Sequence, residues 1–261
     1  MGALGASISI QGVSHAFAAG AYAIRDISLA IDEGQFVSIV GPSGCGKTTI
    51  LNLLAGLLVP QEGSVRLGSD APRAGRHDVA YMLARDCLFP WRTARENAML
   101  GTEFRGLPVD KRGARADEFL RKVGLQGFSG HYPKALSHGM RQRVALARTF
   151  SLESPILLMD EPFGALDAQT KLQLEDVLLE LWNDERRTVL FITHDLAEAV
   201  VLSDRVIVMS PRPGVIVDDI PIPLPRPRSV RQLQKDARYH ELYAKVWSRL
   251  EVGLSQAVAA K

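Results

Sequence analysis

Short apolar segments alternate with helix-like segments along most of the chain. The clearest predicted strands are Ser7–Gln11, Phe36–Val40, Val79–Met82, Ile156–Met159, Val189–Ile192 and Arg205–Met209. Several of these segments are apolar at almost every position, which is typical of strands that are covered on both faces. The pattern therefore predicts an α/β fold built around a mainly parallel sheet.

The N-terminal part of the chain has a different pattern. Ile24–Ile31 and Gly63–Leu67 alternate apolar and polar positions and are separated by turns that contain glycine. Strict alternation is typical of strands that bury only one face. We expect a small antiparallel β subdomain between Ile8 and Arg66, beside the main sheet.

A helical insertion is predicted in the middle of the chain. Between Phe89 and Phe150 the strand pattern fades, and Asp110–Val123 and Gly139–Phe150 carry helical spacing instead. We expect residues 89–150 to form an α-helical subdomain within a core made of residues 1–88 and 151–210. A further run at residues 173–182 places its apolar positions on one helical face, which predicts a helix packed on that core.

Proline marks a boundary after the core. Six of the 14 prolines lie between positions 211 and 227, which excludes a helix there. Beyond them, apolar residues between Tyr239 and Leu250 fall on one helical face, including Val246 and Trp247. Residues 211–261 are thus predicted to be a Pro-rich segment and a C-terminal helix that docks on the core or contacts a partner, within a single-domain chain.

Composition narrows the class of protein. The 261 residues are 46% hydrophobic and 23% charged, and 31 basic residues against 29 acidic ones give a net charge of +2. This balance excludes a disordered chain and argues against nucleic-acid binding through charge. Two cysteines indicate a reducing, cytoplasmic setting. The first ten residues lack a signal-peptide pattern, and the most apolar run, Ile50–Pro60, is too short to cross a bilayer.

The sharpest chemical signal is a phosphate-binding loop, GPSGCGKT, between the strand Phe36–Val40 and a helical run. Its glycines let backbone N–H groups turn toward phosphates, and the following helix adds the positive end of its dipole. Lys47 is predicted to bridge the β- and γ-phosphates, and Thr48 to ligate Mg²⁺. The predicted ATP-binding residues here are Gly41, Pro42, Ser43, Gly44, Cys45, Gly46, Lys47, Thr48 and Thr49.

A second signal is the apolar strand Ile156–Met159, which ends in two carboxylates. Asp160 at the end of the strand suits a role in holding Mg²⁺. Glu161 is placed to act as the general base that polarises an attacking water. Such a run alone is weak evidence, but combined with the phosphate loop it predicts nucleotide hydrolysis.

A third signal, Leu136–Arg143 (LSHGMRQR), lies 90 residues after Lys47, counted to Ser137. The order of phosphate loop, LSxG-type signature, Asp-Glu strand and Thr193-His194-Asp195 resembles the ATP-binding cassette ATPases over roughly Ile8 to Ser210. The resemblance implies a P-loop NTPase core and a head-to-tail homodimer that encloses two ATP molecules.

The resemblance also implies roles for residues outside the phosphate loop. Ser137, His138 and Gly139 are expected to meet the γ-phosphate held by the other subunit, because Ser137 is a favoured N-cap and the helix it opens presents free N–H groups. Asp167 resembles the D-loop residue that crosses the interface. His194 resembles the switch histidine that senses the γ-phosphate and orients Glu161.

An aromatic residue is expected to stack on adenine. Phe17 is the candidate, with Tyr22 and His15 close by in the sequence. Leu88–Trp91 forms an apolar cluster that either packs in the core or receives a coupling helix of a permease.

Two positions depart from the family pattern. The Q-loop glutamine, which ligates Mg²⁺ and touches the transmembrane partner, is replaced by Ala84, six residues before Pro90. His138 stands where the signature usually has glycine. One hypothesis is an active but altered enzyme, since Glu161, Lys47 and His194 are present; the other is a degenerate ATP-binding regulatory module.

The subgroup indicates the setting in which the cassette works. The segments Asp86–Thr93 and Pro223–Arg228 look most like the nitrate, sulfonate and taurine importers. This implies a separate ATPase subunit, peripheral on the cytoplasmic face of the membrane. It would bind permease subunits and, through them, depend on a substrate-binding protein. The alternative class, cassettes that act on nucleic acid, carries very long coiled coils between phosphate loop and signature, and no heptads occur here.

Overall fold

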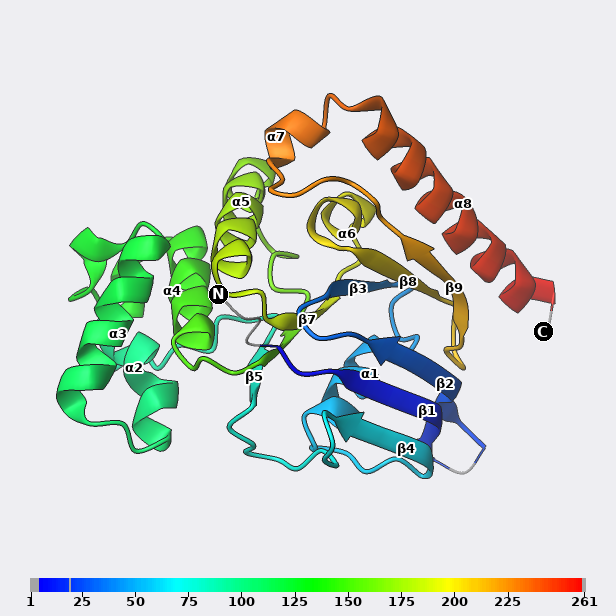
Figure 1. Ribbon diagram of the computed structural model, residues 1–261, viewed down its shortest axis with the longest axis horizontal. Coiled ribbons are helices and arrows are strands. Elements are labelled where there is room, and N and C mark those ends of the chain that lie inside the picture. The colour runs from blue at the N-terminus through cyan, green and yellow to red at the C-terminus, as the bar shows by residue number, and fades with distance from the viewer. Residues whose placement is uncertain (1–4, 19, 260–261) are drawn as a thin grey trace.

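The computed structural model describes residues 5–18 and 20–259 (Figure 1). Part of the segment in which no signal peptide was recognised, residues 1–4, lies outside the described residues. Within the described part of the chain, no helix is long and apolar enough to cross a membrane.

The centre of the molecule is a six-stranded sheet in the order β5–β6–β7–β3–β8–β9. Its first five strands run parallel, and β9 is antiparallel to β8. Their bounds are β3 Phe36–Val40, β5 Val79–Met82, β6 Ile156–Asp160, β7 Thr188–Ile192, β8 Arg205–Met209 and β9 Ile216–Pro221. Strands β3 and β7 are buried at every position because other elements cover both faces. The predicted mainly parallel sheet is confirmed.

A separate antiparallel sheet has the order β2–β1–β4, formed by β1 (Ile8–Ala16), β2 (Tyr22–Ile31) and β4 (Glu62–Leu67), as predicted. Strand β1 extends beyond the predicted end at Gln11. Its pairing with β2 shifts register after Ile10, which interrupts the alternation of apolar and polar residues that would have predicted the second half of the strand. Gly12 there adopts φ 57°, a left-handed conformation that suits glycine.

Helix α1 (Lys47–Leu54) lies between the two sheets. Leu51 and Leu54 are fully buried in an apolar cluster that includes residues of β1, β2, β3 and β4. The two sheets are thereby packed on one helix, which fixes the position of the phosphate loop at its N-terminus.

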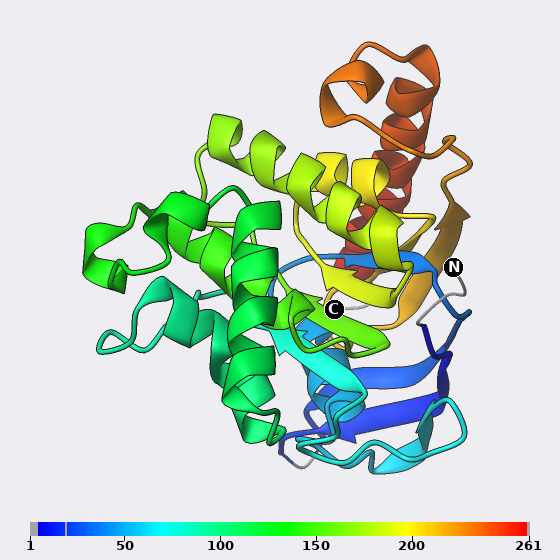
Figure 2. The same cartoon turned by 60° about the vertical axis from the view of Figure 1, so that its left-hand side comes forward.

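Three helices pack together at the side of the main sheet, namely α2 (Ala94–Phe104), α3 (Val109–Lys122) and α4 (His138–Phe150) (Figure 2). Short 3₁₀ turns at Gln126–Phe128 and Pro133–Ala135 connect α3 to α4. Helix α2, which the apolar pattern did not predict, begins at a capping box in which Thr93 and Glu96 exchange hydrogen bonds.

Helices α5 (Ala168–Glu185) and α6 (Leu196–Leu202) cover the face of the main sheet opposite α1. The amphipathic run at residues 173–182 lies in α5, as predicted. Its Trp182 is fully buried and meets the Phe36 ring edge to face, with centroids 5.8 Å apart.

The Pro-rich segment is not only a connection, because it supplies the edge strand β9. After it come α7 (Val230–Leu233) and α8 (Ala237–Ala259). Helix α8 packs on α6, β8 and β9, as predicted for docking on the core. Val246 is buried in this contact, whereas Trp247, expected on the same face, is 48% exposed.

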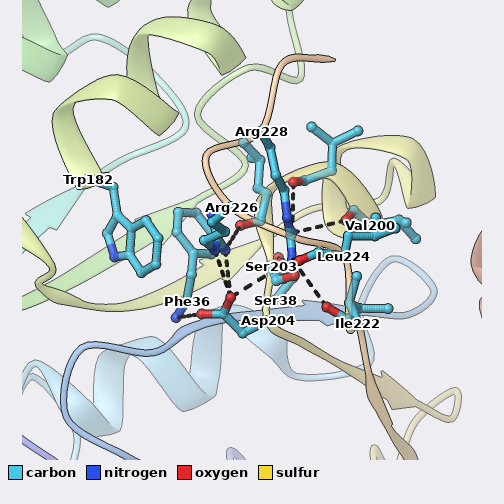
Figure 3. Close-up of polar contacts among 12 residues, drawn as sticks. Phe36, Ser38, Trp182, Val200, Ser203, Asp204, Ile222, Leu224, Arg226 and Arg228 are labelled. Carbon is cyan, nitrogen blue, oxygen red and sulfur yellow. Dashed lines mark hydrogen bonds and ion pairs between the residues drawn. The ribbon is translucent and has the colours of Figure 1, made fainter. Parts of the chain in front are cut away.

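Two arginines attach the C-terminal segment to the core (Figure 3). Arg228 is only 7% exposed, and its guanidinium donates hydrogen bonds of 2.7–3.5 Å to main-chain carbonyls. The acceptors are the carbonyls of Val200, Val201, Ser203, Ile222 and Leu224. Arg226 pairs with Asp204 at 2.8 Å and lies 4.0 Å above the centre of the Trp182 ring. We call this pair of arginines and their partners the arginine clasp.

Candidate nucleotide site

The phosphate loop joins the end of β3 to the start of α1. Gly44 and Gly46 have φ values of 76° and 97°, which L side chains rarely adopt. A Cβ at Gly46 would also clash with the Ile24 side chain and the Ala23 carbonyl of β2. Only glycine fits this close approach between the loop and the antiparallel sheet.

Lys47 is buried, and its Nζ donates to the carbonyls of Gly41 at 2.9 Å and Pro42 at 3.1 Å. The ammonium is therefore held across the mouth of the loop. The N-cap of α1, Gly46, provides no side-chain acceptor for the first N–H groups. Those N–H groups and the helix dipole favour an anion at this point.

A cavity of about 320 Å³ opens above the loop. It is lined by Phe17, Ala23, Ser43, Gly44, Gly46, Lys47, Thr48, Thr49, Glu161 and Arg212. Eight of these, all except Ala23 and Arg212, are predicted site residues of the loop, the aromatic position or the catalytic pair. Gly41, Pro42 and Cys45 belong to the loop without lining the cavity, and burial raises the pKa of the Cys45 thiol.

Of the three candidate aromatic residues, Phe17 alone lines this cavity, and its ring is 63% exposed. His15 is buried and meets Phe17 edge to face at 5.0 Å. The Tyr22 ring lies under the Arg25 guanidinium, 4.6 Å from its carbon. Phe17 thus has a face open to the cavity, and its stacking on adenine stays a prediction.

The predicted metal ligands lie together. Thr48 Oγ1 donates to Asp160 Oδ2 at 2.9 Å. Burial raises the pKa of Asp160, and the hydrogen bond from Thr48 opposes that shift. A hydroxyl and a carboxylate at the edge of a phosphate site are hard oxygen donors of the kind that Mg²⁺ takes, so the residues fit this ion.

Glu161 and His194 form the predicted catalytic pair. Glu161 adopts φ 46°, and its N–H donates to the Ile192 carbonyl at 2.9 Å, so the turn after β6 is fixed against β7. His194 Nδ1 lies 3.2 Å from Glu161 Oε2. Glu161 lines the cavity, whereas His194 does not, and both side chains are partly exposed, so a water molecule has access to the carboxylate.

The signature residues lie at the start of α4, and they do not line the cavity of their own chain. The Ser137 hydroxyl accepts from the Met140 N–H at 3.2 Å as the predicted N-cap. Gly139 faces α5, where a Cβ would meet the Thr170 side chain. Asp167 caps α5 by accepting from the Thr170 N–H at 3.0 Å. Thr170 thus meets both Gly139 and Asp167, so the two predicted interface segments lie side by side, and His138 is the first residue of α4, directly after Ser137.

Comparison with known proteins agrees with this geometry. The family model described as ABC transporter matches residues 24–164. An uncharacterised ABC transporter ATP-binding protein of Methanocaldococcus jannaschii is 47% identical over 206 residues, covering 79% of this chain and 77% of the relative. The taurine import ATP-binding protein TauB of Yersinia pestis is 42% identical over 199 residues, covering 76% and 78%. This chain belongs to the ABC transporter family.

Solved structures agree on the fold of this ABC ATPase. A dimeric ATP-binding cassette in a post-hydrolysis state, bound to ADP and phosphate, is 32% identical with a TM-score of 0.72, over 82% of this chain and 98% of its own. CbiO1 of Clostridium perfringens, part of the ABC transporter complex CbiONQ, matches with a TM-score of 0.75 at 22% identity, over 94% of this chain and 96% of its own. The chain is therefore an ATP-binding, ATP-hydrolysing cassette of a transporter.

The departure at the Q-loop has a structural counterpart in this ABC ATPase. Ala84 is exposed, and its carbonyl accepts from Gln142 Nε2 at 3.5 Å. The same amide donates to the carbonyl of Pro162, directly after Glu161. Arg141 binds Asp86 at 2.9 Å. Helix α4 thus holds both the Q-loop segment and the turn after Glu161 through Arg141 and Gln142, two residues of the signature motif to which the sequence assigned no role of their own.

Lys171 is a second residue that the sequence analysis missed. Its Nζ lies 2.6 Å from Asp195 Oδ2 and 2.7 Å from Glu198 Oε1. Asp195 in turn caps α6 by accepting from the Ala197 N–H at 2.8 Å. The ABC ATPase therefore has an ionic cluster directly behind His194.

Proposed function

We propose that this ABC ATPase powers the import of a small anion, such as nitrate, an alkanesulfonate or taurine, through separate permease subunits. The observation that carries the hydrolytic part is Glu161 beside His194 at the open side of a cavity that also holds Lys47. The taurine import relative named above supports the cargo class. The absence of a membrane-spanning helix among the described residues suits a peripheral subunit on the cytoplasmic face.

The proposed mechanism begins with ATP in the cavity, its phosphates on Lys47 and the loop N–H groups. Thr48 and Asp160 would hold Mg²⁺, which would supply positive charge near the phosphates. Glu161 accepts a proton from the attacking water as the new bond to the γ-phosphorus forms and the bond to the leaving oxygen breaks. His194 keeps the Glu161 carboxylate oriented. Catalysis is thus mainly positioning and charge stabilisation.

A homodimer completes the proposed site. Ser137, His138 and Gly139 of one subunit meet the γ-phosphate bound by the other, and the two Asp167 segments face each other across the interface. The signature lies away from the cavity of its own chain, which supports a second subunit as its ligand-bearing partner. Closure of this dimer on ATP moves α2, α3 and α4, and the permease follows that movement.

A second candidate is a degenerate regulatory cassette that binds ATP without turning it over. Ala84 and His138 favour it, because both change positions that the family uses around the γ-phosphate. A role on nucleic acid has less support, since the helices between Lys47 and Ser137 are only 8, 11 and 14 residues long.

Two measurements test the proposal. The tagged protein is purified from membranes of its native cells in mild detergent, and recovery of a multi-span permease is expected. Phosphate release is then measured with the complex, where Glu161→Gln lowers kcat by about 10²–10⁴-fold while ATP still binds. A wild-type protein that binds ATP but releases no phosphate would establish the regulatory cassette instead. Recovery of soluble partners alone would contradict the importer.

A further inference from the structure

The loop between β8 and β9, residues 210–215, lies against the nucleotide cavity. The Gly214 N–H donates to the Ala23 carbonyl at 2.9 Å, and the Gly214 carbonyl accepts from the Arg25 N–H at 3.0 Å. A Cβ at Gly214 would clash with the Cys45 carbonyl. The loop is therefore wedged between the first residues of β2 and the phosphate loop.

Arg212 extends from this loop to the rim of the cavity. Its Nε donates to the Tyr22 carbonyl at 3.0 Å, and its Nη2 donates to the Ala21 carbonyl at 2.9 Å. Within residues 5–18 and 20–259, the remaining nitrogen, Nη1, has no hydrogen-bond partner. Arg212 lines the same cavity as Phe17 and Lys47, so one edge of its guanidinium is anchored and the rest is available to a ligand.

The turn that carries Phe17 is held from its other side by Gln61. The amide oxygen of Gln61 accepts from the Ala16 N–H at 2.8 Å, and its nitrogen donates to the Ala16 carbonyl at 2.8 Å. Gln61 thus fixes the chain before Phe17, and Arg212 fixes it after. The exposed Phe17 ring and the anchored guanidinium both line the cavity, and each lies next to a main-chain segment that a side chain binds.

We propose that Arg212 binds the nucleoside half of ATP directly, on the same side of the cavity as Phe17. The inference rests on the proposed placement of adenine against Phe17. The phosphates already have Lys47 and the loop N–H groups, whereas Arg212 is attached to the turn that follows Phe17. A guanidinium stacks on a base and donates to its acceptor atoms, and anchoring two of its donors lowers the entropy lost on binding. Among the described residues no cation–π contact joins Arg212 to Phe17, which leaves each free for the nucleoside.

Equilibrium binding of ATP, CTP and inorganic tripolyphosphate tests this proposal, in a Glu161→Gln background so that hydrolysis does not interfere. Arg212→Gln is expected to weaken ATP binding about 5–20-fold and to reduce the preference for ATP over CTP, which corresponds to one lost charged contact. Tripolyphosphate, which lacks a nucleoside, is expected to bind within about twofold of the parent. Arg25→Gln, an exposed neighbour outside the cavity, is the matched control, and thermal midpoints verify folding.

A second series separates direct contact from support of the Phe17 turn. In a Phe17→Ala background, Arg212→Gln is expected still to weaken ATP binding at least threefold. No further loss there would show that Arg212 only holds the turn, and an equal loss for tripolyphosphate would show a general charge effect; either result overturns the proposal. ATP binding that Arg212→Gln leaves unchanged would overturn it as well. None of these readouts requires hydrolysis or a permease, so they stand or fall separately from the importer function.

Discussion

The Nζ atom of Lys171 lies 2.6 Å from the Asp195 carboxylate, and this ion pair joins the helix that begins after Asp167 to the residue that follows His194. Lys171 is half-buried and also binds Glu198. Thr193, on the other side of His194, donates its hydroxyl to the same Glu198 carboxylate. The segment at the proposed dimer interface and the segment with the proposed switch histidine, His194, are therefore attached to one cluster.

Loss of the Lys171 ammonium is expected to slow hydrolysis without changing ATP affinity. Lys171→Met releases the segment around His194, and a small misplacement of a catalytic group is enough for a decrease in kcat of about 10-fold or more. Lys171→Arg, which retains the charge, is expected to keep most of the activity. Steady-state phosphate release and nucleotide titration measure the two effects. Wild-type kcat in a folded Lys171→Met protein would disprove the coupling, and Lys235→Met, at an exposed position, is the control.

The same cluster predicts how stability changes with pH. Glu175 is 3% exposed, and burial, followed by the negative charge of Glu198, raises its pKa to about 8, while Lys171 opposes the shift. The folded state thus holds this proton more tightly than the unfolded state, whose pKa is near 4.5. The stabilisation of the folded state by the proton on Glu175 is complete below pH 4.5 and is lost as pH rises toward 8.

A neutral amide resembles the protonated acid, so the stability of Glu175→Gln does not depend on this proton. The free energy of unfolding of the variant minus that of the wild type is therefore expected to increase by about 2 kcal/mol from pH 6 to pH 8. Urea unfolding at the two pH values measures the difference. Asp195, Asp176 and Tyr239 also face this carboxyl and are unchanged in the variant. Glu180→Gln, on the exposed face of the same helix, is the matched control. An equal change in the free energy of unfolding with pH for Glu175→Gln and for the wild type would rule out a raised pKa of Glu175.

Restoring the missing Q-loop side chain is expected to raise turnover. Ala84 is exposed, so a glutamine fits there without repacking, and its amide oxygen would add a ligand to the magnesium site proposed at Thr48 and Asp160. We expect Ala84→Gln to increase kcat severalfold in the complex with the permease. Unchanged kinetics in that complex would contradict this expectation.

The arginine clasp is expected to be a large contributor to stability. Arg228→Ala leaves several buried carbonyls without a donor, which costs at least about 3 kcal/mol in the free energy of unfolding. Arg226→Ala, which loses one ion pair and the contact with Trp182, is expected to cost less. Denaturant unfolding measures both, with the exposed Arg231→Ala as control. A loss below 1 kcal/mol for Arg228→Ala would show that water replaces the clasp.

The main sheet was predictable because its parallel strands are apolar along their whole length, whereas β9 was not. Only Ile220 of β9 is buried, and prolines surround it, so the segment lacks both the alternation and the length of a typical strand. Its pairing with β8 is a tertiary property. The prolines correctly excluded a helix, but they did not exclude an edge strand that ends at Pro221.

The candidate site also contains residues that the sequence predicts and residues that it does not. The phosphate loop and the Asp160–Glu161 pair were predictable because consecutive residues carry each of them, directly after a buried strand. Gln142 and Arg212 were not, because their partners are main-chain carbonyls of segments 58 residues and about 190 residues away. A side chain that binds backbone atoms leaves no complementary residue in the sequence to reveal it.

Arg228 of the arginine clasp likewise binds main-chain carbonyls, and this determines which substitutions the clasp tolerates. Because the hydrogen-bond acceptors of Arg228 are all main-chain carbonyls, a substitution of an acceptor residue's side chain leaves these hydrogen bonds intact as long as the backbone keeps its path. The arginine itself is not interchangeable, even with lysine, whose single ammonium cannot reach both groups of carbonyls from one position. Arg228 thus holds a contact that no other side chain in the clasp can supply, beside the Arg226–Asp204 pair and the packing of α8.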